Sequence, residues 1–591
     1  MRRERGGDGV LRAGRARISP DGYAGTGPGE WPGSGPAHGP APARRIRGLP
    51  SHGLPDPIAP VAETAAFPSA QRRFLRRERG ATGAGSTGAR LPHRPGREDR
   101  SVRTSADPAR LRRVAVIAGV VGMLAGIAGS WIPSFWGDEA ASIMSASRTW
   151  PELWRMLQTV DGVHGAYYAF LHVWIGLFGA SEFSVRLPSA IAAGFLAAGT
   201  AVLAGRFGGP RLALASGLVA ALLPRTAVMA AEARSYAIGS AIAVWLTVLL
   251  LALLQRRRPW WLWAAYAAGT AAAIYVFLYL ALLLVVHGVF VLVFHRRVLW
   301  RWLAGAAAGV LLALPIVLVA AAERNQIGFL AYRDYITPLN VLALQWFDPA
   351  TAWPCLALIA LGAIAALRAR RRDPGGFRLS ALALLWLVLP TAAVLIESTL
   401  IAPMYTVRYL SFCTPAAAIL VAMGMLTAAG WIARCTPLAA ATATGILLAV
   451  VLAAFVPNLL VLRGPYAKDG SDWRAAAGYL HAHAKRGDAV VYDDRPKDSE
   501  KPRLITAIHR ADVAGLGDPA LLASFRTQPG LWDRTRPNDA LTAADLTPEV
   551  WALERGPDPE HSPDVRHLES LGYRILSSHR INVTTVLHLE R

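Results

Sequence analysis

About eleven long apolar runs between residues 113 and 457 limit the possible folds of this chain more than any other feature. Each run is close to the ~20 residues that an α-helix needs to cross a hydrocarbon core of ~30 Å. Composition agrees, because 53% of the residues are hydrophobic and only 17% are charged. The sequence therefore predicts an all-α polytopic membrane protein. The expected spans are residues 113–133, 186–205, 211–230, 236–254, 260–277, 279–295, 302–321, 352–367, 379–397, 409–431 and 437–457.

The placement of arginine predicts the orientation of these spans. If residue 1 is cytoplasmic, every cytoplasmic loop between spans carries arginine, as at residues 256–258 and 368–372, which satisfies the positive-inside rule. This alternation requires that Gly165–Phe178 is not a span. That segment is short and carries Tyr, His and Trp, so we expect a juxtamembrane helix in the outer headgroup region. The net charge of +22 is then a topology signal and not a nucleic-acid-binding surface.

The composition divides the chain into three regions. Residues 1–110 are rich in Gly, Pro and Arg without sustained apolar periodicity, and are predicted to be a disordered cytoplasmic tail. Residues 111–457 form the multi-span domain, and residues 458–591 are predicted to form a small external soluble α/β domain. Its expected elements are a helix over 473–484 capped by Ser471 and Asp472, a strand over 488–492, a helix over 565–571, and strands over 573–576 and 584–589.

An acidic pair, Asp138 and Glu139, follows directly on the first apolar run. Carboxylates at a membrane edge are costly unless water, a cation or a reaction partner meets them. Asp161 and His164 come shortly afterwards, and their spacing of three could place them at one site in a helical turn. A carboxylate is a suitable general base for a hydroxyl acceptor. We therefore expect this outer loop to carry chemistry.

Two arginines at outer loop ends are candidates for binding a charged leaving group. Arg234 lies in the segment Glu232-Ala-Arg-Ser-Tyr236, and Arg408 lies at the end of a later outer loop. Guanidinium groups bind phosphate through paired hydrogen bonds, and they oppose negative charge that builds up in a transition state.

Each of these signals also has a simple structural interpretation. The acidic pair could merely cap a helix, His164 could be a hydrogen-bonded interfacial histidine, and Tyr167 and Tyr168 could be belt aromatics. Arg186, Arg234 and Arg408 could be interface anchors. What favours a functional site is the order of all these residues on one side of the membrane.

The same residues carry a family resemblance. They read Asp138-Glu139, Asp161-x-x-His164-x-x-Tyr-Tyr, and Trp174-x-x-Leu-Phe-Gly-x-Ser-Glu182-x-x-x-Arg186-Leu-Pro-Ser189. This pattern resembles the polytopic lipid-phosphate-dependent glycosyltransferases, and within them the protein O-mannosyltransferase and aminoarabinose-transferase branch with its actinobacterial mannosyltransferase-like members. The resemblance covers roughly residues 113–495.

The resemblance implies an inverting glycosyltransferase of the plasma membrane. Its donor would be a polyprenyl-phosphate sugar, most simply mannose, its acceptor a protein, lipid or glycan, and no nucleic acid would be involved. Asp138 would be the general base, with Glu139 and His164 also catalytic. The implied donor-binding residues are Asp161, Tyr167, Glu232, Arg234, Tyr236 and Arg408.

One motif of this sequence differs from the family's pattern, and the metal ligands stay open. The family's Asp-x-His-Pro-Pro element reads Asp161-Gly-Val-His164-Gly-Ala here, with one extra residue and no prolines. Some relatives bind a divalent cation near this site, but the carboxylates and His164 show no specific metal spacing here. Metal ligands are therefore not assigned.

Three other functions are compatible with the sequence. One is transfer of a pentose or aminoarabinose to a lipid or glycan. Another is a lipid or sugar transporter, although transporters place ionisable residues near the midplane and often show repeated halves. The third is an outer scaffold formed by residues 458–591. Asp138 and Arg408 converging in an outer cavity would favour an enzyme, whereas a continuous polar path would favour transport.

Overall fold

The computed structural model describes residues 107–255, 259–324, 326 and 335–591. The predicted tail, residues 1–110, lies outside this part of the chain except at its last four residues. These begin helix α1, Pro108–Ile127, where the Asp107 side chain accepts the backbone N–H of Ala109 at 3.0 Å and proline occupies the first turn. Both features are typical of a helix start.

Helix α5, Glu182–Leu222, is a hairpin of two helices. Gly209 has φ 73° and ψ −172°, and Pro210 follows it. A Cβ built on Gly217 would lie 2.9 Å from the Cβ of Ala201, so the second half folds back on the first. The two arms correspond to the spans expected at 186–205 and 211–230, and the second continues into α6, Pro224–Ala230.

Small residues bring α1 and α5 close together. A Cβ on Gly126 would lie 2.9 Å from the Cα of Ala190, and one on Gly122 would lie 3.0 Å from the carbonyl oxygen of Ala193. Membrane helices associate through this kind of close backbone packing, because lipid tails are as apolar as leucine and burial alone supplies little driving force.

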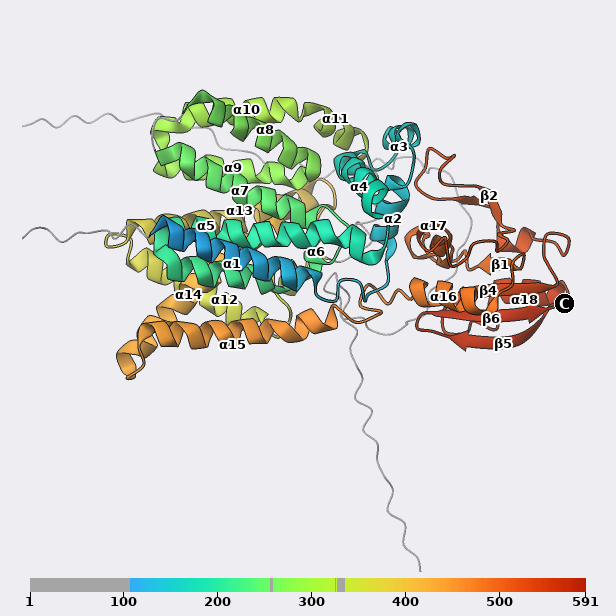
Figure 1. The fold of residues 1–591 in the computed structure, drawn as a ribbon. Helices are drawn as coiled ribbons and strands as arrows, with labels where there is room; N and C mark the ends of the chain where they lie inside the picture. Colours follow the sequence, from blue (N-terminus) through green and yellow to red (C-terminus); the bar gives the residue numbers. More distant parts are fainter. Residues whose placement is uncertain (1–106, 256–258, 325, 327–334) are drawn as a thin grey trace, which may run out of the picture. The chain divides into compact units, whose positions relative to one another are not determined.

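The remaining long helices run alongside these (Figure 1), and each expected span coincides with a helix or a pair of helices. By length and composition, five helices of the described part can cross a membrane, or six if the bent pair α10–α11 counts as one span. The chain is therefore a mostly helical, multi-pass membrane protein, and the count of about eleven spans stays a prediction. The bounds of the remaining helices are α7 Tyr236–Gln255, α8 Trp260–Val276, α9 Leu282–Phe294, α10 Leu299–Leu312, α11 Leu314–Ala322, α12 Ala352–Arg368, α13 Pro374–Leu400, α14 Thr414–Cys435 and α15 Ala440–Val461.

Three short helices follow α1 and form the loop that contains the acidic pair. They are α2 Gly137–Ala146, α3 Trp150–Leu157 and α4 Gly165–Phe178, the last with the bounds expected for the juxtamembrane helix. A capping box between Thr149 and Glu152 starts α3. The apolar faces of these helices share one core with Trp473 and Leu480 of the C-terminal region, so this loop has a fixed shape.

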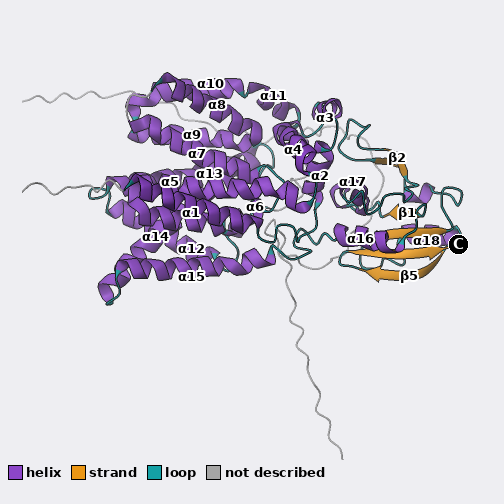
Figure 2. Ribbon diagram, in the orientation of Figure 1, coloured by secondary structure: helices purple, strands orange, loops and turns teal. Residues whose placement is uncertain are grey.

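The C-terminal region contains the strands of the described part of the chain (Figure 2). Its four-stranded sheet has the order β1 (Ala489–Tyr492), β4 (Glu549–Arg555), β6 (Thr584–Glu590), β5 (Arg574–Arg580), with β1 parallel to β4 and the other pairs antiparallel. The sequence predicted the strands β1, β5 and β6 and the helices α16 and α18. It did not predict β4, which lies between β1 and β6. The bounds are α16 Trp473–His483, β1 Ala489–Tyr492, α17 Ile505–Ile508, β2 Leu521–Ala523, β3 Arg534–Thr535, β4 Glu549–Arg555, α18 Pro563–Ser570, β5 Arg574–Arg580 and β6 Thr584–Glu590.

The predicted capping of α16 by Ser471 and Asp472 is wrong, although the helix starts where expected. Neither side chain caps the helix. One Asp472 oxygen accepts the backbone N–H groups of residues 582–584, and the Ser471 hydroxyl donates to the carbonyl oxygen of Phe135. Ser471 therefore joins the start of α16 to the segment before α2, and Asp472 joins it to the final hairpin.

Candidate active site

Asp138 lies in the first turn of α2, and its carboxylate faces two arginines. One oxygen, Oδ2, accepts a hydrogen bond from Arg408 Nη1 at 2.6 Å and lies 3.4 Å from Arg234 Nη2. The side chain of Asp138 keeps 22% of its exposure, so a ligand could reach it. Three segments far apart in the sequence therefore converge on one carboxylate.

Neighbouring groups fix the positions of both arginines. The guanidinium of Arg408 lies over the ring of Trp136 at 5.4 Å from its centre, within cation–π range. Arg234 donates from Nη1 to the hydroxyl groups of Ser142 and Tyr168 at 3.3 and 3.4 Å. These contacts hold the cations close to Asp138 before any ligand arrives.

Asp161 and His164 lie at the edge of the same network. Asp161 takes a left-handed conformation (φ 57°), and its Oδ2 accepts the hydroxyl of Tyr168 at 2.8 Å. A chain of contacts thus runs from Asp161 through Tyr168 and Arg234 to Asp138. His164 follows in a short 3₁₀ turn, Gly162–His164, and its ring centre lies 5.9 Å from that of Tyr168.

The charges of this cluster set the protonation states of Asp138 and His164. Burial alone would raise the pKa of Asp138, but Arg408, Arg234 and His164 outweigh it and lower the pKa to about 2. Burial, with the nearby Arg234, lowers the pKa of His164 to about 4, so this imidazole is neutral at pH 7. Two guanidinium groups therefore face the carboxylate of Asp138, and the carboxylate of Asp161 lies further away, beyond the Tyr168 hydroxyl.

Glu139 lies beside Asp138 but faces away from this cluster. It is fully buried and forms a bidentate pair with Arg186, at 2.7 and 2.6 Å, while its Oε1 also accepts the backbone N–H of Ala233 at 3.0 Å. Burial opposes ionisation, yet Arg186 keeps the pKa of Glu139 below its usual value. Because Ala233 precedes Arg234, this pair positions the cationic loop.

Glu232 forms a second buried pair, with Lys468. Their charged atoms lie 3.3 Å apart, and both side chains are at most 4% exposed. Burial lowers the pKa of Lys468 despite Glu232. The sequence analysis missed Lys468, although lysine occurs at only four positions in the chain and this is the first of them. The scarcity of lysine was the one feature of the sequence that could have drawn attention to Lys468.

Aromatic side chains form a wall next to the two arginines. The rings of Tyr236 and Phe277 lie 5.4 Å apart, and those of Tyr279 and Tyr409 lie 4.8 Å apart, with Phe277 stacked on Tyr279. Of these, only Tyr236 was predicted. Tyr167 is buried, and its hydroxyl has no hydrogen-bond partner in the described part of the chain. A wall of this kind can contact a sugar ring or an isoprenoid.

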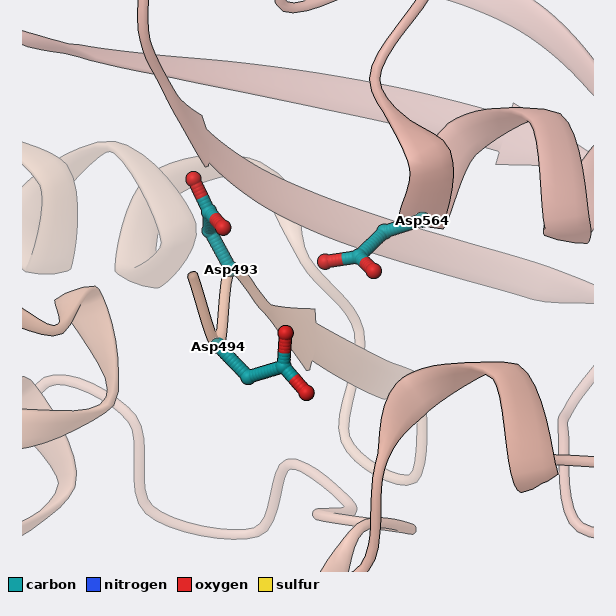
Figure 3. A group of neighbouring side chains, drawn as sticks. All are labelled: Asp493, Asp494 and Asp564. Atoms are coloured by element: carbon teal, nitrogen blue, oxygen red, sulfur yellow. The ribbon is translucent and has the colours of Figure 1, made fainter. Parts of the chain in front are cut away.

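The predicted site residues do not assemble a metal site. Asp138, Asp161 and His164 bring no three ligand atoms within reach of one ion. Within the described ranges the one such group is Asp493, Asp494 and Asp564 of the C-terminal region (Figure 3), whose ligand atoms lie within 4.8 Å of one another.

The other contacts of that aspartate group argue against an ion there. Both oxygens of Asp493 already accept hydrogen bonds from the Arg495 guanidinium and from the backbone N–H groups of Arg495 and Arg555. Asn538 donates to Asp564 at 2.8 Å. An arginine therefore occupies the position from which a cation would neutralise Asp493.

A protein-family comparison gives the class of the chain. A family model described as dolichyl-phosphate-mannose-protein mannosyltransferase matches residues 166–321. The matched stretch contains Glu232, Arg234 and Tyr236, whereas Asp138 and Arg408 lie outside it. The match confirms the resemblance that the motifs indicated, and the chain is a multi-pass membrane glycosyltransferase. No curated protein matches the chain.

Several solved structures are similar at low identity. ArnT from Cupriavidus metallidurans bound to undecaprenyl phosphate is 14% identical, with 80% of this chain and 97% of that chain covered and a TM-score of 0.49. The oligosaccharyltransferase AglB from Archaeoglobus fulgidus, in complex with an inhibitory peptide and a dolichol-phosphate, is 10% identical, with 75% and 69% covered and a TM-score of 0.41. The arabinofuranosyltransferase AftD from Mycobacteria is 17% identical, with 81% and 40% covered and a TM-score of 0.42. At these values no residue role transfers to this chain.

Proposed function

We propose that the chain is an inverting glycosyltransferase that moves a sugar, mannose, from a polyprenyl-phosphate donor to an acceptor hydroxyl at the outer membrane face. The observation that carries this proposal is the convergence of Arg234 and Arg408 on Asp138 beside a wall of aromatic rings. Such a cluster offers a phosphate two guanidinium groups and offers a hydroxyl one carboxylate. The ArnT structure has undecaprenyl phosphate bound, and the AglB structure has a dolichol-phosphate bound.

The contacts around Asp138 suggest how donor binding and base catalysis are coupled. Without donor, both guanidinium groups face Asp138 and hold its pKa near 2, where a carboxylate is a weak base. A donor phosphate would draw Arg408 and Arg234 towards its own oxygens. The pKa of Asp138 then rises towards the working pH, so the base becomes effective only when the donor is in place.

The proposed reaction is a single displacement at the anomeric carbon. The acceptor hydroxyl oxygen attacks that carbon while its proton passes to Asp138, and the bond between the carbon and the phosphate oxygen breaks. The bonding electrons leave with the lipid phosphate, whose added negative charge the two guanidinium groups oppose. Glu139 and Glu232 hold the backbone of the Arg234 loop through their pairs with Arg186 and Lys468, and neither carries a proton in the reaction.

Transfer from a donor panel tests the proposal. Membranes containing the chain are incubated with radiolabelled polyprenyl-phosphate mannose, arabinose, aminoarabinose and glucose, and both acceptor labelling and release of polyprenyl phosphate are measured. We expect transfer from the mannose donor and loss of transfer in membranes with an equal amount of Asp138→Asn. Transfer from a pentose donor alone would contradict the mannose assignment. Movement of intact donor across vesicles without release of the sugar would indicate a transporter.

A further inference from the structure

A groove lies between helices α8 and α10, and it has no part in the proposed reaction. Its volume is about 540 Å³, and its lining includes the small residues Ala264, Ala304, Gly305 and Ala308. Trp260, Trp263 and Arg301 also line it. The groove therefore combines an apolar channel with one lining arginine, Arg301.

The groove is far from the candidate active site. The end of α8 leads into Phe277, whose ring contacts Tyr236 at 5.4 Å beside the arginine cluster. Trp260 is the first residue of this 17-residue helix. At 1.5 Å per residue, the two ends of α8 are about 25 Å apart. A ligand with its charged group at Arg301 is therefore not a donor with its phosphate at Arg408.

Rigid packing behind the groove shows that it is preformed. Trp302, next to Arg301, is buried and donates from its indole N–H to the Tyr266 hydroxyl at 3.0 Å, and Tyr266 bonds to His287 at 2.9 Å. A Cβ on Gly309 would lie 2.8 Å from the carbonyl oxygen of Ala267. The two helices thus touch beyond the groove, which closes one end of it.

The open end has the chemistry of a membrane interface. Trp260 is 79% exposed and Trp300 is 80% exposed, which is typical of an aromatic belt at headgroup level. Arg301 is exposed, and no carboxylate of the described residues pairs with it. Arg296 and Arg297 precede it in the short turn that starts α10. This end therefore attracts anions.

We propose that the groove binds an anionic phospholipid, with its phosphate at Arg301 and one acyl chain along Ala304, Gly305 and Ala308. Basic pockets between membrane helices on the cytoplasmic side favour such headgroups, and an arginine near the membrane surface contributes about 1 kcal/mol to the attraction. The positive charge at the open end selects an anionic over a zwitterionic lipid, while the small side chains leave room for the chain.

Native mass spectrometry of the full chain in detergent tests the proposal, with dioleoyl-phosphatidylglycerol and dioleoyl-phosphatidylcholine as probes. We expect the chain to retain phosphatidylglycerol preferentially. Arg301→Gln should reduce that preference about fivefold, which is ~1 kcal/mol expressed as a binding ratio. Gly305→Leu, which fills the groove, should reduce binding of both lipids. Arg434→Gln, at an exposed arginine outside the groove, is the matched control and should change neither.

Three outcomes would overturn the proposal. One is equal retention of the two phospholipids by the wild-type chain. Another is a preference for phosphatidylglycerol that survives Arg301→Gln, a variant at an exposed position that should fold normally. The third is displacement of phosphatidylglycerol from the groove by low concentrations of undecaprenyl phosphate, which would make the groove a site for the donor tail.

Discussion

Asp138 is the carboxylate that faces both arginines of the site, so its replacement tests the proposed chemistry most directly. Asparagine keeps the size of the side chain but cannot accept the acceptor's proton. General-base catalysis typically contributes ~10²–10⁴-fold in rate, and Asp138→Asn should lose turnover by about that factor while still binding donor. Asp161→Asn should be milder, because the Asp161 carboxylate is hydrogen-bonded to Tyr168 and lies further from the reacting groups than Asp138.

That comparison requires equal amounts of folded, membrane-inserted protein for each variant. Initial transfer rates at saturating donor are the measurement. If Asp138→Asn keeps near-full transfer while Glu139→Gln or Asp161→Asn abolishes it, the general base has been assigned to the wrong residue.

Arg408 is the second residue whose replacement is informative. A lysine keeps the charge but loses the planar group that lies over Trp136 and that can bind phosphate through two hydrogen bonds. Arg408→Lys should therefore weaken transfer by about tenfold or more, since hydrogen bonds to charged groups contribute ~1.5–3 kcal/mol. The exposed Arg434→Lys serves as control. Unchanged kinetics in Arg408→Lys would remove Arg408 from the donor site and leave Arg234 as the candidate.

The pKa values of the free site predict a flat pH profile around neutrality. Asp138, with its pKa lowered to about 2, is ionised above that pH, and its ion pairs weaken only as the pH falls towards 2. His164, with its pKa lowered to about 4, is protonated only below that pH. We expect kcat/KM to vary little between about pH 5.5 and pH 7.5. An inflection near pH 6.5 that disappears in His164→Asn would show that this imidazole titrates in the working range.

At the scale of elements, the contact between α1 and α5 predicts a position-specific effect of alanine. Gly126→Ala places a Cβ 2.9 Å from the Cα of Ala190, whereas Gly445→Ala in α15 places one in open space. Overpacking costs ~1–3 kcal/mol, while alanine in an exposed helix gains up to ~1 kcal/mol over glycine. Thermal unfolding in detergent should show Gly126→Ala destabilised and Gly445→Ala neutral or stabilised. Equal shifts would mean that α1 does not pack on α5 in this way.

The helical elements were predictable because their signal is local. A run of about 20 apolar residues indicates a membrane helix without knowledge of its neighbours. The hairpin in α5 could also be predicted, since Gly209-Pro210 interrupts the apolar pattern between two expected spans. Strand β4 was not predicted. Its sequence, Glu-Val-Trp-Ala-Leu-Glu-Arg, mixes helix and strand formers, and it forms a strand because β1 and β6 supply partners on both sides.

The candidate site was predictable only in part, because the sequence shows local signals but not the contacts between distant residues. Asp138, Arg234 and Arg408 could be proposed because each lies at the end of an apolar run. Their neighbours in space could not be assigned, because the pairing of Lys468 with Glu232 joins residues more than two hundred positions apart. Glu139 likewise forms a fully buried pair with Arg186, a contact that its place beside Asp138 in the sequence does not reveal.

At the scale of the whole molecule, the loop that contains α2, α3 and α4 and the C-terminal region must lie on the same side of the membrane. Arg148, just after α2, donates to the carbonyl oxygens of Gln528 and Gly530 at 2.9 and 2.7 Å, and the Ser471 hydroxyl donates to Phe135. Neither contact could form across a bilayer. The side on which residues 458–591 emerge is therefore also the side on which Asp138 lies.

The arginine distribution predicts that this side is the outer one, which reporter fusions can measure. Fusions of alkaline phosphatase, active only outside, and of green fluorescent protein, fluorescent only inside, are made after Arg257, Arg371 and Lys485. We expect fluorescence at the first two positions and phosphatase activity at Lys485. Phosphatase activity at Arg257 or Arg371 would contradict the topology. A fluorescent fusion at Lys485 would place the site in the cytoplasm, where an externally presented lipid-phosphate sugar could not reach Asp138 and the proposed donor would have to be replaced.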